Sequence, residues 1–126
     1  MTNPSSAATV RPARAAPAQP VRAGTATQMQ VLLGPEQGAP NFAMRLFTMG
    51  PGGGMPRHTN QVEHEQYVLR GRARVTIGEQ VHEVGPHHTL YIPAGAPHSY
   101  EVLEAPFEFL CVVPNAPDQI RLADDC

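Results

Sequence analysis

Short runs of alternating apolar and polar residues, each ended by glycine or proline, recur along most of this 126-residue chain. Clear examples are Asn41 to Met49, Ala73 to Ile77 and Phe107 to Val113. A period of two is typical of strands with one buried face, and spacings of about 8–12 residues favour a sandwich or barrel. Fourteen prolines and eleven glycines disfavour long helices, and only Asp118 to Leu122 hints at a helical period. The pattern predicts an all-β fold.

The first 24 residues have a different composition. Met1 to about Gly24 consists largely of Ala, Pro, Arg, Ser and Thr, with almost no large apolar side chain. Such a segment buries too little surface to offset the entropy lost on ordering. We therefore expect residues 1–24 to form a disordered tail and residues 25–126 to form one barrel domain.

Composition also restricts the classes of partner that we expect the protein to bind. The formal net charge of -2 gives no basic face for nucleic acid. No apolar run approaches the roughly 20 residues that a membrane span requires. The N-terminus lacks the apolar segment of a signal peptide, so we expect a cytoplasmic protein. We therefore expect the protein to bind a small-molecule substrate, and we expect neither nucleic acid nor a membrane as a partner.

Three of the six histidines stand in two motifs. In His58-x-Asn60-x3-His64, all three positions have the same parity, so on one uninterrupted strand their side chains would share a face. In Pro93-Ala-Gly-Ala-Pro-His98, a tight turn delivers His98 to the start of a new strand. We predict that these histidines converge inside the barrel. Neutral imidazoles there suit Mn, Fe, Ni, Cu or Zn.

The other histidines receive a different interpretation. His82 lies on a predicted hairpin strand, and His87 and His88 lie in a loop beside Gly85-Pro86. We interpret all three as solvated or turn-satisfying side chains. For the first three histidines, the alternative to metal ligation is a metal-free barrel that binds its ligand by hydrogen bonds alone.

The two histidine motifs resemble the paired signatures of the cupin superfamily, His-x-His-x3-Glu-x6-Gly and Pro-x-Gly-x2-His. The spacing is kept: His58 takes the first ligand position, His64 replaces the usual Glu, Gly71 closes the motif and His98 ends the second one. A His in place of that Glu is similar to the small single-domain four-histidine manganese cupins of thermophilic bacteria. Further similar stretches are Ala39 to Thr48, Glu63 to Glu65 and Phe107 to Cys111.

This resemblance covers about residues 27 to 115. It implies a double-stranded β-barrel of the jelly-roll type and a homodimer. At position 60, however, this chain has Asn where those relatives have a fourth ligating His. An amide oxygen is a weaker ligand for a late transition metal, so we expect Asn60 to ligate weakly or through a water. The alternative is a site that has lost its metal.

Three neutral ligands leave the full 2+ charge on a metal and favour anionic or chelating partners. With Mn, Fe or Cu, open positions suit O2 or peroxide; with Zn or Ni, the metal acts as a Lewis acid. The four-histidine relatives are associated with oxidative cleavage of styrene-type alkenes by peroxides. The resemblance therefore implies a metal-dependent oxidoreductase with a small hydrophobic or aromatic substrate. The alternatives are a Zn- or Ni-dependent lyase or isomerase, and a non-catalytic ligand-binding cupin.

The predicted substrate pocket contains Met55, Phe109, Cys111 and Arg45. Met55 precedes His58 by three residues, and the resemblance places Phe109 and Cys111 near the metal. Met, Phe and Cys make an apolar pocket suited to an aromatic substrate. Arg45 is a candidate for binding a substrate carboxylate. No residue is assigned a catalytic role at this stage.

Overall fold

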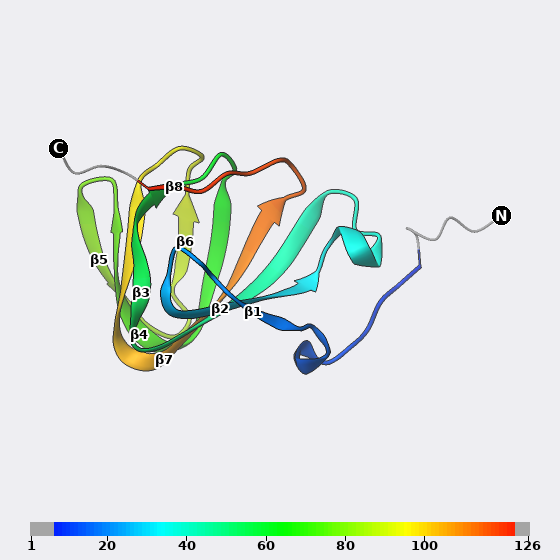
Figure 1. Cartoon of the computed structure of the whole chain (residues 1–126), viewed down its shortest axis with the longest axis horizontal. Coiled ribbons are helices and arrows are strands. Elements are labelled where there is room, and N and C mark those ends of the chain that lie inside the picture. The colour runs from blue at the N-terminus through cyan, green and yellow to red at the C-terminus, as the bar shows by residue number, and fades with distance from the viewer. Residues whose placement is uncertain (1–6, 123–126) are drawn as a thin grey trace.

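The computed structural model describes residues 7–122, which are almost entirely β-strand (Figure 1). The strands are β1 (Ala18–Pro20), β2 (Thr25–Leu33), β3 (Phe42–Thr59), β4 (His64–Ile77), β5 (Gln80–Val84), β6 (Thr89–Ile92), β7 (His98–Pro114) and β8 (Arg121–Leu122). Two short 3-10 helices, η2 (Ala13–Ala15) and η3 (Pro35–Gln37), are the helical elements of this part of the chain. None of the described helices has the length and apolar character needed to cross a bilayer. The predicted all-β barrel fold is confirmed.

The strands form one strongly curved antiparallel sheet. Its order is β1-β2-β3-β7-β4-β5, and in addition β6 pairs with β4 and β8 pairs with β3. The long strand β4 pairs on one side with β6 near its start and with β5 near its end. It also pairs with β7 along most of the length of β4. The hairpin predicted at Gly78-Glu79 connects β4 to β5. The sheet therefore wraps around an interior that is open at the upper end in Figure 1.

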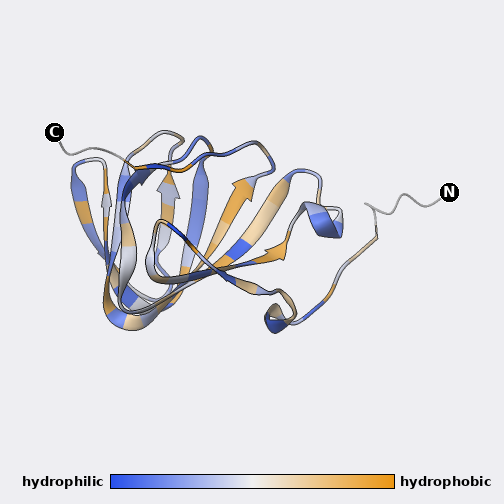
Figure 2. Cartoon of the chain, viewed as in Figure 1, coloured by the Kyte–Doolittle hydropathy of each residue, from blue (hydrophilic) through white to orange (hydrophobic). Residues whose placement is uncertain are grey.

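Alternation along the strands fills this interior. In β4, His64, Gln66 and Val68 are buried, while the residues between them are exposed. Figure 2 shows the same change between hydrophobic and hydrophilic colour along the long strands. The apolar core includes Phe47, Met49, Met55, Val68, Val75, Ile92, Tyr100, Phe107 and Phe109. Because side chains alternate between the faces, a shift of one residue would turn this whole set outward, and so burial specifies the register.

The N-terminal segment differs from its prediction. Residues 1–6 lie outside the described part of the chain, but β1 pairs in register with β2, with Ala18 opposite Gln30. The guanidinium group of Arg11 donates hydrogen bonds to the carbonyl oxygen of Leu32, at 2.8 Å and 3.2 Å. Edge pairing satisfies backbone groups without burying large side chains. Low apolar content was therefore an insufficient reason to predict disorder for residues 7–24.

The C-terminal segment crosses the open end of the barrel. It leaves β7 and reaches β8, where Leu122 pairs with His58 and Arg121 with Thr59 (Figure 1). Asp118 to Leu122 is thus extended rather than helical. This pairing places Asp118 and Ile120 over the interior, where both line the cavity described below.

A glycine bend in β3 brings the histidine region against β7. The ladder between β3 and β7 shifts between Met49 and Gly54 and then resumes, with Met55 opposite Tyr100. Gly54 has a φ of +152°, and a Cβ there would overlap the carbonyl oxygen of Tyr100. Only glycine allows β3 and β7 to approach this closely at the bend.

We predict that Gly54→Ala destabilises the protein far more than Gly52→Ala. Gly52 lies in the same bend with a φ of +70°, but a Cβ there would meet no atom within 4 Å. Gly52→Ala should therefore lower the free energy of unfolding by only about 1–2 kcal/mol, the cost of a left-handed backbone. Gly54→Ala adds a steric clash and should cost at least about 3 kcal/mol. Denaturant unfolding of both variants measures the difference, and equal losses would contradict this role of Gly54.

Candidate functional site

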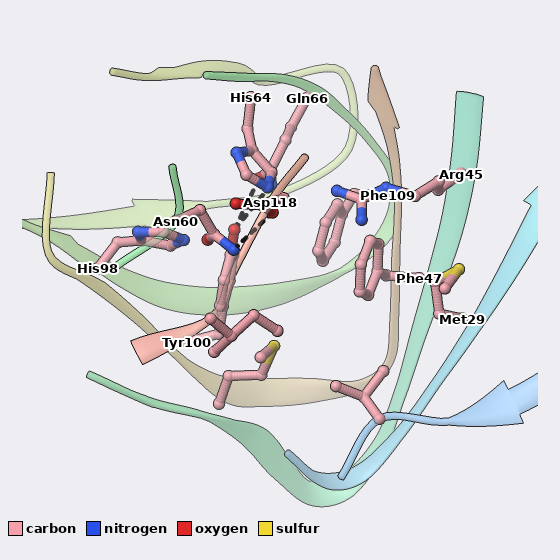
Figure 3. Close-up of a pocket in the computed structure, with 13 residues that line it drawn as sticks. Met29, Arg45, Phe47, Asn60, His64, Gln66, His98, Tyr100, Phe109 and Asp118 are labelled. Atoms are coloured by element: carbon pink, nitrogen blue, oxygen red, sulfur yellow. Dashed lines mark hydrogen bonds between the residues drawn. The ribbon is translucent and has the colours of Figure 1, made fainter. Parts of the chain in front are cut away.

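A cavity of about 100 Å³ lies inside the open end of the barrel, beneath the C-terminal segment. Its lining residues are Val21, Met29, Arg45, Phe47, Met55, Asn60, His64, Gln66, His98, Tyr100, Phe109, Asp118 and Ile120. Figure 3 shows two unlike ends: imidazole and amide groups lie at one, and aromatic rings with a guanidinium group lie at the other. The cavity can therefore contact both a polar group and an aromatic ring of one ligand.

The three motif histidines gather at the polar end. His58 on β3 and His98 on β7 are directly paired, and their ring centroids are 4.1 Å apart. His64, at the start of β4, has its ring centroid 6.0 Å from that of His98. The exposed fractions are 3% for His58, 5% for His64 and 2% for His98. His64 and His98 line the cavity, and His58 lies behind them against His98.

These histidines come from three strands. β3 ends at Thr59, the chain turns, and β4 begins at His64. The condition of one uninterrupted strand, on which His58, Asn60 and His64 would share a face, is therefore not met. The turn is held to the second motif, because the backbone N–H of Gly95 donates to the carbonyl oxygen of Asn60 at 2.8 Å.

Each of the three imidazoles is oriented by the backbone in the same way. Nδ1 of His58, His64 and His98 lies 2.8, 3.0 and 2.9 Å from the carbonyl oxygen two residues earlier in the chain. A carbonyl oxygen only accepts, so Nδ1 carries the proton and donates it. The neutral ring then leaves Nε2 with a free lone pair, which is the arrangement found in most metal-binding histidines.

Burial keeps these imidazoles neutral. Desolvation lowers the pKa of His58. It lowers the pKa of His98 to about 4, and burial together with the nearby charge of Arg45 lowers the pKa of His64 to about 4. A neutral imidazole is the form that offers a lone pair to a cation.

Asn60 is oriented by the C-terminal segment. Its Nδ2 donates to one carboxylate oxygen of Asp118 at 3.1 Å, and the other oxygen accepts from the backbone N–H of Gln61 at 2.6 Å. The amide oxygen Oδ1 of Asn60 is buried and has no hydrogen-bond partner among the described residues. An unpaired buried carbonyl oxygen is costly and needs a donor or a cation. The position predicted as a weak ligand therefore presents an acceptor that no group among residues 7–122 satisfies.

The three imidazole nitrogens have the right chemistry for a late transition metal, and the amide oxygen of Asn60 is a weaker neutral ligand. Within residues 7–122, however, no group of three or more His, Cys, Asp or Glu side chains is already arranged to hold a metal ion. The imidazoles are gathered and correctly protonated, but their free nitrogens do not yet share one point.

The opposite end of the cavity is a stack of aromatic rings. Phe47 and Phe109 are nearly parallel with centroids 5.1 Å apart, and Tyr100 stacks on Phe109 at 5.3 Å. The Tyr100 hydroxyl and the Gln66 side chain form a buried hydrogen-bonded pair, with Nε2 of Gln66 2.8 Å from the hydroxyl. Burial raises the pKa of Tyr100, so the hydroxyl keeps its proton. The stacked rings give this end of the cavity an apolar lining.

Arg45 shares this apolar end. Its guanidinium carbon lies 5.1 Å from the centroid of Phe47, and Nη2 is 3.3 Å from the sulfur of Cys111. In Figure 3 the guanidinium group extends from β3 into the region beside Phe47 and Phe109. Met55 and Phe109, two residues of the predicted substrate pocket, also line the cavity.

Cys111 differs from its prediction. Its thiol is fully buried and lies behind Arg45 and Gln66 rather than in the lining. Cys111 stands directly opposite Arg45 across β3 and β7, and the longer side chain covers it. Burial raises the pKa of this thiol, which favours the unreactive protonated form.

The site residues that the sequence analysis missed include Gln66, Tyr100 and Asp118. Gln66 follows His64 with the same parity, so strand periodicity alone could have found it. Tyr100 follows His98 in the same way. Asp118 had no such signal, because only the path of the C-terminal segment across the barrel brings it to Asn60.

The remaining histidines lie away from the cavity. His82 is exposed on β5, Nδ1 of His87 lies 2.8 Å from the Tyr67 hydroxyl, and Nδ1 of His88 accepts from the backbone N–H of Gly85. These are the solvated and turn-satisfying roles that we predicted.

We predict that the metal-free protein becomes less stable as the pH falls from 6.5 toward 4. The three buried imidazoles have lowered pKa values, so the unfolded chain takes up protons before the folded protein does. His64 and His98, whose pKa values are lowered to about 4, each remove about 1.4 kcal/mol of stability per pH unit in this window, and His58 acts in the same direction. Denaturant unfolding at several pH values measures the slope. His98→Gln should reduce it, whereas His82→Gln, at an exposed position, should not; a flat profile would contradict neutral burial.

The chain is similar to known proteins over most of its length. Residues 45–113 match the family model of the cupin domain. The polyketide cyclase RemF from Streptomyces resistomycificus is 28% identical with a TM-score of 0.85, covering 95% of this chain and 88% of that one. A cupin 2 domain-containing protein from Halorhodospira halophila is 32% identical with a TM-score of 0.73, covering 79% of this chain and 71% of that one.

Among curated proteins, the oxalate decarboxylase OxdC from Bacillus subtilis strain 168 is 34% identical over 77 residues, or 57% of this chain. The chain spans a fifth or less of the length of the curated relatives it matches. The family model covers more than half of the chain and includes both histidine motifs. The barrel, the motifs and this match together establish that the chain belongs to the cupin family.

Proposed function

We propose that the protein is a metal-dependent cupin in which His58, His64 and His98 bind one divalent transition metal through Nε2. The observation that carries this proposal is the identical Nδ1–carbonyl hydrogen bond on all three buried imidazoles. Three such bonds leave three free nitrogen lone pairs, on His64 and His98 in the cavity lining and on His58 next to His98. The unpaired Oδ1 of Asn60 is the proposed fourth protein group, as a weak ligand or as the acceptor for a bound water.

The ring separations support this ligand set. Two imidazoles bound to one ion through bonds of about 2.1 Å have ring centroids roughly 4.5 to 6.5 Å apart. The separation of 6.0 Å between His64 and His98 lies in that range, and the 4.1 Å between His58 and His98 is slightly below it. A modest change in ring orientation on metal binding would therefore bring the nitrogens to one point.

For the reaction, the best-supported class is a non-redox conversion of a small aromatic carbonyl compound, such as an aldol-type cyclisation. The support is the similarity to the polyketide cyclase RemF, whose match covers most of both chains. When bound, the metal would supply Lewis-acid chemistry, which polarises a carbonyl oxygen and acidifies the adjacent C–H groups. The sequence analysis gave Lewis-acid chemistry only in its alternative, a Zn- or Ni-dependent lyase or isomerase; the oxidoreductase with O2 or peroxide stays a prediction.

The residues of the chain have defined tasks in this proposal. The parallel rings of Phe47, Phe109 and Tyr100 hold a planar substrate and exclude water. The protonated Tyr100 hydroxyl, paired with Gln66, adds a neutral hydrogen-bonding group to this lining. The amide of Asn60, fixed by Asp118, keeps its oxygen available at the polar end.

Metal content tests the ligand set directly. Protein purified without added metal should contain about one transition metal ion per chain by elemental analysis, and His98→Ala should lose it. His82→Ala, which removes an exposed histidine, is the matched control and should retain the metal. A wild-type protein that cannot be loaded with Mn, Fe, Ni, Cu or Zn would contradict the proposal.

Asn60→His should bind metal more tightly than the wild type, by roughly tenfold or more, because an imidazole replaces a weaker amide oxygen. In the wild type the carboxylate of Asp118 accepts a hydrogen bond from Asn60, and Nδ1 of the new imidazole could donate to the same carboxylate. Competition with a chelator measures the affinity. Equal or weaker binding would mean that position 60 does not face the metal.

The reaction class is tested with a linear phenyl triketone under anaerobic conditions. Cyclisation forms one C–C bond between the terminal methyl carbon and the carbonyl carbon beside the phenyl ring, releases one water and gives a phenylresorcinol. It requires no oxidant. The metal-loaded protein should accelerate this product, and His98→Ala should not. Turnover that depends on O2 or peroxide would instead support the oxidoreductase.

A further inference from the structure

The charge of Arg45 is not balanced within the described chain. The arginines of β4 are all paired on the outside of the barrel, Arg70 with Glu108, Arg72 with Glu83 and Glu104, and Arg74 with Glu101. Arg45 lines the cavity and has no carboxylate within ion-pair distance among residues 7–122. An arginine that faces an apolar interior without a counter-ion is costly, because its charge is partly desolvated.

The hydrogen-bonding capacity of this guanidinium is also largely unused. Among the described residues its one hydrogen bond is from Nη2 to the sulfur of Cys111, a weak acceptor. Nε is buried and has no partner. Guanidinium N–H groups form a rigid planar fork that matches two oxygens of one anion. The free donors of Arg45 therefore fit a planar oxyanion better than any group this part of the chain provides.

The residues around Arg45 indicate which chemical group is attached to such an oxyanion. Its guanidinium group stacks over Phe47, whose ring begins the parallel series continued by Phe109 and Tyr100. Met29 and Met55 complete the apolar lining. A ligand with its oxyanion at Arg45 would thus place an aryl group against this lining, with the histidines at the other end of the cavity (Figure 3).

We propose that Arg45 is the anchor for an anionic substrate, so that the cavity takes a small aromatic compound bearing a planar oxyanion, either a carboxylate or the enolate of a conjugated carbonyl. This inference rests on the proposed function for its setting and adds the substrate class. The anion site itself consists of Arg45 and the aromatic lining, and it requires no metal.

The test measures binding of benzoate and its neutral analogue benzamide to chelator-treated protein by NMR titration. The wild type should prefer benzoate by at least tenfold. Arg45→Met, which keeps the side-chain length and removes the charge, should abolish this preference. Arg45→Lys should recover only part of it, because an ammonium lacks the planar fork. Arg70→Met removes a largely exposed arginine and should change nothing.

Thermal unfolding separates anchoring from a structural role. If Arg45 is an unpaired anchor, Arg45→Met should melt at the same temperature as the wild type or higher. A variant that melts lower, together with Arg45→Lys that restores melting but no benzoate preference, would overturn the proposal in favour of a structural role. Equal binding of benzoate by the wild type and Arg45→Met, or no binding by either, would also overturn it.

Two further arms identify the source of the oxyanion and separate this proposal from the metal site. Tropolonate, a planar enolate-type anion, is titrated beside benzoate, and the probe that loses more affinity in Arg45→Met shows which oxyanion the site prefers. Metal content is measured on the same samples. If no metal binds but the benzoate preference depends on Arg45, the metal proposal fails and the anion-anchor proposal stands. If metal binds but the benzoate preference does not depend on Arg45, only the anion-anchor proposal is overturned.

Discussion

The pairing of β3 with β7 positions six of the thirteen residues that line the cavity: Arg45, Phe47, Met55, His98, Tyr100 and Phe109. It sets His58 directly opposite His98 and Arg45 opposite Cys111, so the two ends of the site belong to one ladder. The two strands come close at the bend because Gly54 has no side chain to meet the backbone of Tyr100. The histidine end and the aromatic end are therefore held at a fixed separation by the same ladder, which favours a ligand of defined length.

The fold and the histidine set were predictable because they depend on local pattern. Alternation identified the long strands, and the spacing of the two motifs identified His58, His64 and His98. The parity argument failed at Asn60, because a turn replaces the strand there and the contact with Gly95 holds it. Strand periodicity describes which face a residue occupies only as long as the strand continues.

Other features depend on contacts between distant segments, which a single sequence does not encode in any local signal. The carboxylate of Asp118 reaches Asn60 across 58 positions of the chain. The N-terminal segment is ordered through edge pairing and the hydrogen bonds of Arg11, not through a hydrophobic pattern. Arg45 was named as a candidate because of the strand on which it lies. Its proposed role as an anion anchor depends on the absence of a counter-ion among the described residues, which the sequence alone does not reveal.

The proposed function requires that three imidazoles share one metal ion. X-ray absorption spectroscopy on protein loaded with one equivalent of zinc tests it most directly, because imidazole ligands have a distinctive scattering pattern. We expect three imidazole nitrogens at about 2.0–2.1 Å from the zinc ion, with one or more oxygen ligands completing the coordination. A first shell with no imidazole, or with only one, would contradict the assignment of His58, His64 and His98 as the metal site.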